Sequence, residues 1–92
     1  TIRSFWETPG HRDSEQALKS WYAITKRADW GSPQDVKAQF GNASVIGNNR
    51  VVFNIAGNKY RLIVQFNYPC RIGYLRFVGT HAQYDRVDAE HI

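Results

Sequence analysis

The 92-residue sequence is poor in several residue types that normally reveal structure or location. It contains one cysteine, no methionine and three prolines. Because Cys70 is alone, it cannot form an internal disulfide, and without further Cys or Cys-His spacing there is no structural zinc motif. The apolar runs are too short to cross a membrane, and the first residues lack signal-peptide character. We therefore expect a cytoplasmic protein that needs no disulfide, metal or cofactor, and the missing initiator methionine indicates a chain that begins inside a longer gene product.

Acidic residues are absent from the centre of the chain. Residues 36–84 contain six lysines and arginines and no Asp or Glu, whereas the two charge types are equal in number in residues 1–35. A basic stretch without counter-charges keeps a positive electrostatic field, which favours a polyanionic partner. The length suits one small domain, and we expect residues 1–92 to form a single unit.

Residues 50–85 contain the clearest secondary-structure pattern. β-branched and aromatic residues are concentrated in residues 51–55, 59–68 and 72–80, and Gly57-Asn58 and Pro69-Cys70 interrupt them. Strand formers separated by two turn residues are typical of β-hairpins. The pattern predicts three consecutive antiparallel strands, and a further short strand is expected at residues 43–46.

The first forty residues have the periodicity of helices. Apolar residues recur at helical spacing in residues 13–28, and Asp13 with Gln16 resembles a capping box at their start. Residues 33–40 begin with proline after a serine, which is typical of a helix start. Residues 1–7 also have helical spacing. Helices followed by hairpins predict an α+β fold in which the helices pack on one face of an antiparallel sheet.

Two-residue turns determine which strand residues share a face of the sheet, because side chains alternate along each strand. One face is apolar and should form the core with the helices; it contains Val51, Phe53, Tyr60, Leu62, Val64, Phe66, Leu75 and Phe77. The opposite face, the outer face, contains Arg50, Asn54, Lys59, Arg61, Gln65, Tyr74, Arg76 and Thr80, with Val52, Ile63 and Val78 between them. We predict that the outer face is a cationic platform with aromatic side chains.

A basic outer face is either an ordinary solvated surface or a binding site for an anion. A solvated face usually mixes charges of both signs, but this segment lacks acidic residues. Arg61 and Arg76 lie on adjacent predicted strands, where two positive charges cost stability unless an anion bridges them. Arginine matches phosphate oxygens bidentately, and an exposed tyrosine can stack on an unpaired base. We therefore predict RNA contacts from Arg50, Asn54, Lys59, Arg61, Tyr74 and Arg76.

His81, Tyr84 and Asp85 form a candidate site directly after the last predicted strand. In a helical turn, their i, i+3 and i+4 spacing places them on one face. Histidine titrates near neutral pH, tyrosine can donate a proton, and aspartate can orient the imidazole, so the three groups suit general acid–base chemistry. The alternative is that His81 and Asp85 make only a local structural bond. A metal site formed by His81, Asp85 and His91 is disfavoured, because three nearby ligands in basic surroundings are too few for a cation.

Two segments, NNRVVFNIAGNKYRL and FVGTHAQYDRVDAE, are similar to the HigB-type toxins of bacterial type II toxin–antitoxin systems, within the RelE-like superfamily. The segments TIRSFWE, LKSWY and ADWGSPQDVKAQF fit the same family, so the resemblance covers essentially the whole chain. It implies an antiparallel sheet with helices on one side, a ribosome-dependent mRNA endonuclease, and a HigA-type antitoxin of the helix-turn-helix class as partner. Members of the family usually begin with a short strand, and we do not find its pattern here.

The resemblance also implies a metal-independent reaction, in which a 2′-hydroxyl attacks the adjacent phosphate and leaves a 2′,3′-cyclic phosphate. It assigns Arg61 and Arg76 to the scissile phosphate, with Lys59 as a nearby phosphate contact or proton partner. His81 and Tyr84 would share the proton transfers, and Asp85 would orient His81. The division between His81 and Tyr84 stays open. Two alternative functions also stay open: a non-catalytic RNA- or ribosome-binding module, and an inactive relative of the toxins.

Overall fold

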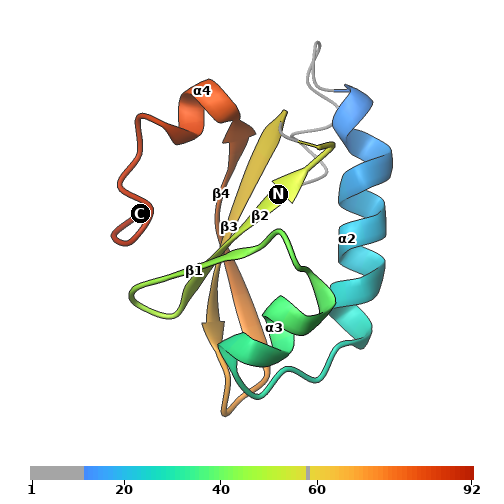
Figure 1. Ribbon diagram of the computed structural model, residues 1–92, viewed down its shortest axis with the longest axis vertical. Helices are drawn as coiled ribbons and strands as arrows, with labels where there is room; N and C mark the ends of the chain where they lie inside the picture. Colours follow the sequence, from blue (N-terminus) through green and yellow to red (C-terminus); the bar gives the residue numbers. More distant parts are fainter. Residues whose placement is uncertain (1–11, 58) are drawn as a thin grey trace.

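The computed structural model describes residues 12–57 and 59–92 and confirms the expected α+β fold (Figure 1). The elements in chain order are η1 (Arg12–Ser14), α2 (Glu15–Arg27), α3 (Pro33–Gln39), β1 (Ser44–Ile46), β2 (Arg50–Ile55), β3 (Tyr60–Asn67), β4 (Ile72–Thr80) and α4 (His81–Tyr84). The four strands form one antiparallel sheet in the order β1-β2-β3-β4. The helix expected at residues 1–7 lies outside the described residues. Within the part that the structure describes, no helix has the length and apolar character needed to span a membrane.

Turn residues explain the hairpin at each end of β2. Asn48 and Asn49 both have φ of 59°, in the left-handed region that asparagine tolerates better than most residues. Across the second hairpin, Ile55 pairs with Tyr60, which is the register that a turn centred on Gly57 and its neighbour predicts. The order of side chains on the two faces of β2 and β3 is therefore confirmed.

The register changes within β4, where one extra residue forms a β-bulge. Val64 pairs with Leu75, but Ile63 pairs with Phe77, so Arg76 stands between them without a partner in β3. An inserted residue reverses the expected faces of all residues after it, because side chains alternate. Phe77 therefore lies on the outer face, whereas Val78 and Thr80 lie on the core side. The predictions for these three residues were wrong, because nothing in the turn pattern indicates the bulge.

The core lies between the helices and one face of the sheet. Helix α2 contributes Leu18 and Trp21, and α3 contributes Val36. Leu18 and Val36 are fully buried. Phe53 of β2 is at the centre, with its ring 5.4 Å from that of Trp21 and 5.2 Å from that of Phe40, both in edge-to-face geometry. Such contacts add to the gain from area burial. The helices therefore cover the face that the sequence predicts.

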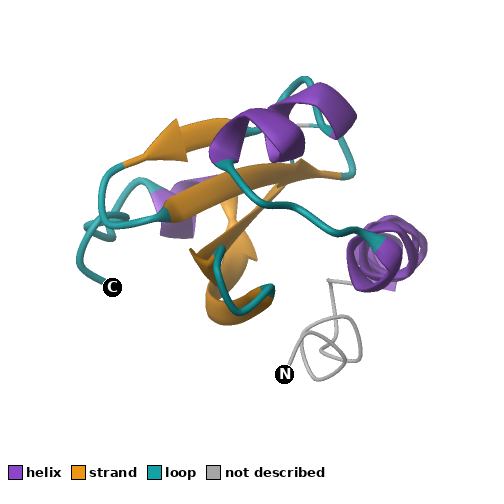
Figure 2. Cartoon of the chain, turned by 90° about the horizontal axis from the view of Figure 1, so that it is seen from below, coloured by secondary structure: helices purple, strands orange, loops and turns teal. Residues whose placement is uncertain are grey.

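The outer face has a smaller apolar layer of its own. Val52 and Ile63 point to it, yet they are only 3% and 0% exposed and do not belong to the main core cluster. The segment after β4 lies on this face, because Tyr84 contacts Arg61 and the carbonyl of Ile92 binds Arg50. Figure 2 shows this C-terminal segment and α2 on opposite sides of the strands. The expected platform is thus covered over β2 and β3 and exposed along β4.

Asp13 anchors the start of α2 to the sheet instead of capping the helix. Ser14 occupies the N-cap position, and the Asp13 carboxylate accepts hydrogen bonds from the hydroxyl of Tyr60 and from Lys59 Nζ, the latter at 2.5 Å. The predicted capping box was therefore wrong. The hydrogen bond from Lys59, followed by that from Tyr60, lowers the pKa of Asp13. The Asp13 carboxylate, together with burial, raises the pKa of Tyr60 to about 12.

We predict that Phe53→Ala and Phe77→Ala differ strongly in stability, which tests the corrected register. Phe53 is 1% exposed at the centre of the core, so its removal should lower the free energy of unfolding by about 3–5 kcal/mol. Phe77 is half-buried on the outer face, so its removal should lower the free energy of unfolding by less than half as much. Urea denaturation of both variants measures the difference. Equal losses of stability would contradict the corrected register and indicate that Phe77 lies in the core.

We predict that Tyr60 makes stability fall at alkaline pH. Because folding raises its pKa from the ordinary value of 10 to about 12, its contribution is complete below pH 10 and is lost as the pH rises to 12. Tyr60→Phe should cost about 1 kcal/mol at neutral pH through the lost hydrogen bond and should remove this part of the alkaline loss. Asp13→Asn should remove it too, because the carboxylate is the main cause of the shift. Denaturation curves from pH 8 to 12 measure the effect; unchanged slopes in both variants would contradict it.

Candidate functional site

Five of the six predicted catalytic residues lie where β3 begins and β4 ends, although the Lys59 ammonium is turned toward Asp13 at the start of α2. We call this group the α4 cluster; it consists of Lys59, Arg61, His81, Tyr84 and Asp85. The backbone N–H of His81 donates to the carbonyl of Lys59 at 3.1 Å, which fixes the start of α4 beside β3. The guanidinium of Arg61 lies over the ring of Tyr84, 5.9 Å from its centroid. The helical turn expected at residues 81–85 therefore exists and lies at the rim of the outer face.

A capping box holds α4 in place. Thr80 Oγ1 accepts from the backbone N–H of Gln83 at 3.2 Å, and Gln83 Oε1 accepts from the N–H of Thr80 at 2.8 Å. Gly79 pairs with Arg61, and a Cβ there would lie 2.6 Å from the Phe77 ring and 2.7 Å from Gln83 Oε1. Glycine is thus required for space. The sequence Gly-Thr-His-Ala-Gln encodes a strand end followed at once by a capped turn.

His81 and Asp85 form an accessible acid–base pair. Their Nδ1 and Oδ2 atoms are 3.2 Å apart, and the side chains are 52% and 60% exposed. A carboxylate beside Nδ1 favours the tautomer with the proton on that nitrogen, which leaves Nε2 as the acceptor. Among the described residues Nε2 has no partner, so the imidazole is open to a ligand.

Lys59 and Arg61 provide positive charge with different partners. Lys59 is 67% exposed and pairs with Asp13, a residue to which the sequence pattern assigned only a helix cap. Arg61 is half-buried, and besides contacting Tyr84 it donates to the carbonyl of Tyr60 at 3.3 Å. Arg61 is thus held against the ring that it contacts.

Arg76 and Tyr74 lie apart from the α4 cluster. Arg76 donates through Nε and Nη2 to Gln65 Oε1, at 3.0 and 2.6 Å, and its guanidinium lies over the ring of Tyr74. Gln65 and Arg61 share the outer face of β3 but are four residues apart, about 13 Å at roughly 3.3 Å per residue. Arg61 and Arg76 are therefore on one face, as expected, without being neighbours. A groove of about 490 Å³ adjoins Arg76, Tyr74 and Gln65.

Two of the predicted RNA contacts are engaged elsewhere. Arg50 is only 8% exposed, and its Nη2 donates to the carbonyl of Ile92 at 2.7 Å. The expectation that Arg50 faces RNA does not fit this burial, since the C-terminal segment covers it. Asn54 is half-buried opposite Arg61 and donates to the carbonyl of Asn42 at 3.2 Å.

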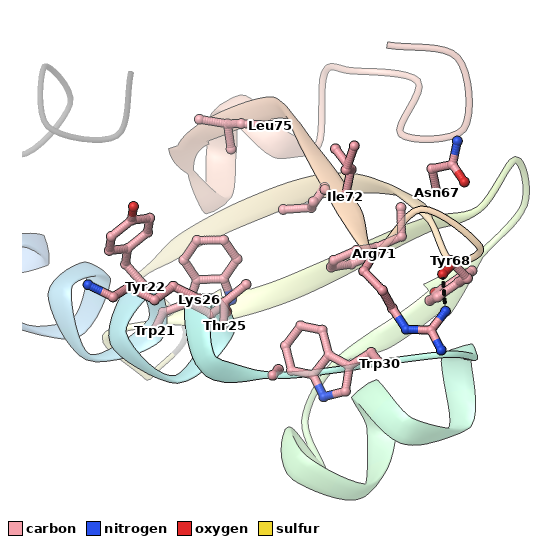
Figure 3. Close-up of a pocket in the computed structure, with 14 residues that line it drawn as sticks. Trp21, Tyr22, Thr25, Lys26, Trp30, Asn67, Tyr68, Arg71, Ile72 and Leu75 are labelled. Atoms are coloured by element: carbon pink, nitrogen blue, oxygen red, sulfur yellow. Dashed lines mark hydrogen bonds between the residues drawn. The ribbon is translucent and has the colours of Figure 1, made fainter.

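Metal-ligating groups do not converge in residues 12–57 and 59–92. His91 bonds to Asp88, with 2.8 Å between Nδ1 and Oδ2, rather than joining His81 and Asp85. A larger cavity of about 630 Å³ lies between α2 and β4 (Figure 3). Its residues Trp21, Val64 and Phe66 belong to the core side of the sheet, so it is separate from the α4 cluster.

Comparison with known proteins agrees with this arrangement. Residues 14–87 match the HigB toxin family, described as the RelE-like toxic component of a toxin–antitoxin system. The chain is also 27% identical over 73 residues to a protein named mRNA interferase HigB from Escherichia coli O6:H1, strain CFT073; the alignment covers 77% of this chain and 71% of that protein. The family match extends from the start of α2 through the sheet and α4. The chain therefore belongs to the HigB family of RelE-like toxins, the toxic components of toxin–antitoxin systems.

Proposed function

We propose that this toxin is a ribosome-dependent mRNA endonuclease that inhibits translation, and that residues 1–92 act as one domain. The α4 cluster is the observation that carries the proposal, because it joins an exposed acid–base pair to an arginine on a basic face. The relative from Escherichia coli is named an mRNA interferase, which agrees with the same chemistry. A HigA-type antitoxin of the helix-turn-helix class is the proposed partner, and the cytoplasm is the proposed place of action.

The proposed reaction uses a nucleophile that belongs to the RNA. A base removes the proton of a 2′-hydroxyl, whose oxygen attacks the adjacent phosphorus, and the bond from phosphorus to the 5′-oxygen breaks. An acid gives a proton to that leaving oxygen, so the products are a 2′,3′-cyclic phosphate and a 5′-hydroxyl. His81 and Tyr84 carry the two proton transfers, with Asp85 orienting His81. Arg61 stabilises the charge that develops on the phosphoryl oxygens.

The remaining basic residues hold the RNA on either side of the cut. Lys59 is exposed beside the cluster and can exchange Asp13 for a phosphate oxygen. Arg76 and Tyr74 lie further along the outer face, where an arginine and an aromatic ring suit a phosphate and an unpaired base. While Arg76 stays bonded to Gln65, it binds a phosphate next to the scissile one. To contact the scissile phosphate itself, Arg76 would have to release Gln65. Metal ions are not needed, because the attacking oxygen is activated by a side chain.

We predict that His81→Ala and Tyr84→Phe reduce cleavage without much loss of binding. Losing a positioned acid or base costs on the order of a hundredfold to ten-thousandfold in the chemical step, whereas the arginines that bind RNA remain. His91→Ala is the matched control, since His91 is an exposed histidine paired with Asp88 outside the cluster. The assay adds purified protein to translating ribosomes with a defined mRNA and maps the cut ends.

The same assay separates this mechanism from the alternatives. An mRNA with a 2′-methoxy group at the cut position should bind but resist cleavage, and EDTA at concentrations that preserve the ribosome should change nothing. Cleavage of the blocked substrate would indicate a water nucleophile. Binding without cleavage by the unaltered protein would indicate a non-catalytic RNA- or ribosome-binding module or an inactive relative.

We predict that Arg61→Ala and Arg76→Ala each weaken RNA binding and reduce its salt dependence. Loss of one phosphate contact should lower the slope of log affinity against log salt by about one unit, with similar losses for different RNA sequences. Arg71→Ala is the control, because Arg71 pairs with Asp29 and lines the cavity between α2 and β4. Fluorescence anisotropy at several salt concentrations measures the slopes. Unchanged slopes in both variants would make the outer face an ordinary solvated surface.

A further inference from the structure

A polar groove lies beside the outer face, where β3 runs into its hairpin. It has a volume of about 490 Å³, and its lining comes from the turn before β2, from β3 and the loop that follows it, and from Tyr74 and Arg76 of β4. The groove adjoins the last residues of β3, whereas Asp13 and the α4 cluster adjoin the first. We call it the Gln65 groove, and it is a separate site from the α4 cluster.

Two amide side chains in the Gln65 groove have their oxygens held by donors of the protein. Gln65 Oε1 accepts from Arg76 Nε and Nη2 at 3.0 and 2.6 Å. Asn67 Oδ1 accepts from the backbone N–H of Cys70 at 3.3 Å. A guanidinium and a backbone amide can only donate, so neither side-chain amide can turn around without losing these bonds. The orientation of both amides is therefore fixed, with their NH2 groups left over.

The Gln65 groove thus presents hydrogen-bond donors. Asn67 is exposed, and its Nδ2 has no partner among the described residues. Gln65 Nε2 makes one long contact, of 3.4 Å, to the carbonyl of Asn48, and Arg76 adds the N–H groups that Gln65 leaves unused. Among the described residues that line the groove there is no carboxylate. A ligand of this groove must therefore bring acceptors.

Tyr74 gives the groove a flat surface next to these donors. It pairs with Gln65 in the sheet, is 49% exposed, and has the Arg76 guanidinium 5.7 Å from its ring centroid. Aromatic rings and guanidinium planes are the surfaces on which unpaired bases stack. A phosphate would need only the donors. Donors beside a flat surface fit the edge and the plane of a nucleic-acid base.

We propose that the Gln65 groove binds one unpaired RNA base and prefers the keto bases, guanine and uracil, to adenine and cytosine. The O6 of guanine or the O4 of uracil accepts from Asn67 Nδ2, whereas adenine and cytosine place an amino donor at the same point. Two donors that face each other leave both without an acceptor, which is costly. The inference rests on the proposed function, and it supplies a sequence preference that phosphate contacts cannot give.

The position of the groove places this base a few nucleotides from the cut. Gln65 lies about 13 Å from Arg61 along β3. Stacked bases follow one another at about 3.4 Å along a strand, so this distance corresponds to about four stacked nucleotides, or to fewer in an extended strand. The preference should therefore appear at one fixed position on one side of the cut.

The first test measures RNA binding by fluorescence anisotropy, with short oligocytidylates that carry one guest base. A guanine or uracil guest should bind about fivefold more tightly than an adenine guest or oligocytidylate itself, which is the effect of about one net hydrogen bond. Because uracil and adenine differ in the opposite order in stacking area, the comparison of these two guests separates hydrogen bonding from stacking. Equal affinities for all guests would overturn the proposal.

The variant Asn67→Asp should reverse the preference. Its carboxylate keeps an oxygen for the N–H of Cys70 but replaces the donor with an acceptor, which suits the amino groups of adenine and cytosine. Asn42→Asp is the matched control, because Asn42 is an exposed asparagine beside a different groove; its added charge should weaken all guests equally. The preference is a ratio of affinities within one sample, so a misfolded fraction cancels. An unchanged ratio in Asn67→Asp, or equal changes in both variants, would overturn the proposal.

Mapping of the cut ends on translating ribosomes separates this proposal from the nuclease function. With the unaltered toxin, guanine and uracil should be enriched at one position near the cuts, and Asn67→Asp should shift the enrichment to adenine and cytosine. Cuts without an enriched position that depends on Asn67 would overturn the base site and leave the nuclease function standing. Guest-dependent binding without any cut would support the base site and overturn the nuclease function.

Discussion

One inserted residue in β4 determines what the outer face can do. The bulge at Arg76 shifts the alternation of side chains by one residue. Odd-numbered residues therefore point to the core side before the bulge, as Leu75 does, and to the outer face after it, as Phe77 does. The bulge brings Phe77 over Ile63 on the outer face and places Gly79 opposite Arg61. The free space at Gly79 accommodates the ring of Phe77 and the side chain that caps α4. Without the bulge, the strand would end with the opposite face turned outward, and α4 would not begin beside Arg61.

The cations of the outer face are held in place by partners that an anion can replace. Arg76 bonds to the neutral amide of Gln65, and Arg61 contacts the ring of Tyr84. Hydrogen bonds from arginine to a neutral group are weaker than those to phosphate, and an exposed ion pair such as Lys59–Asp13 contributes little. The side chains of Arg76 and Lys59 are thus ordered in advance, at low cost to a later ligand. Preorganisation of this kind favours both binding and transition-state stabilisation.

Sequence patterns predicted the parts of the molecule that depend on local preferences. The two hairpins follow from turn residues and strand formers, and α4 follows from the i, i+3 and i+4 spacing of His81, Tyr84 and Asp85. The bulge was missed because a single extra residue changes no local propensity. The burial of Arg50 was missed because its partner, Ile92, is 42 positions away in the sequence. Asp13 was assigned to a helix cap because its contacts with Lys59 and Tyr60 are equally remote.

The core side of the sheet also carries groups that lower the stability of the free toxin. On the core side of the sheet, the hydroxyls of Thr25 and Tyr68 are shielded from solvent and have no hydrogen-bond partner among the described residues, and such groups disfavour the folded chain. A domain of this size has a small margin of stability, so such terms matter. A partner that binds only the folded state adds about 2.7 kcal/mol of stability at a hundred times its Kd. Because α2 and the C-terminal segment that carries the α4 cluster lie on opposite sides of the sheet, a partner that bound the helix side would stabilise the toxin without occupying its proposed active site.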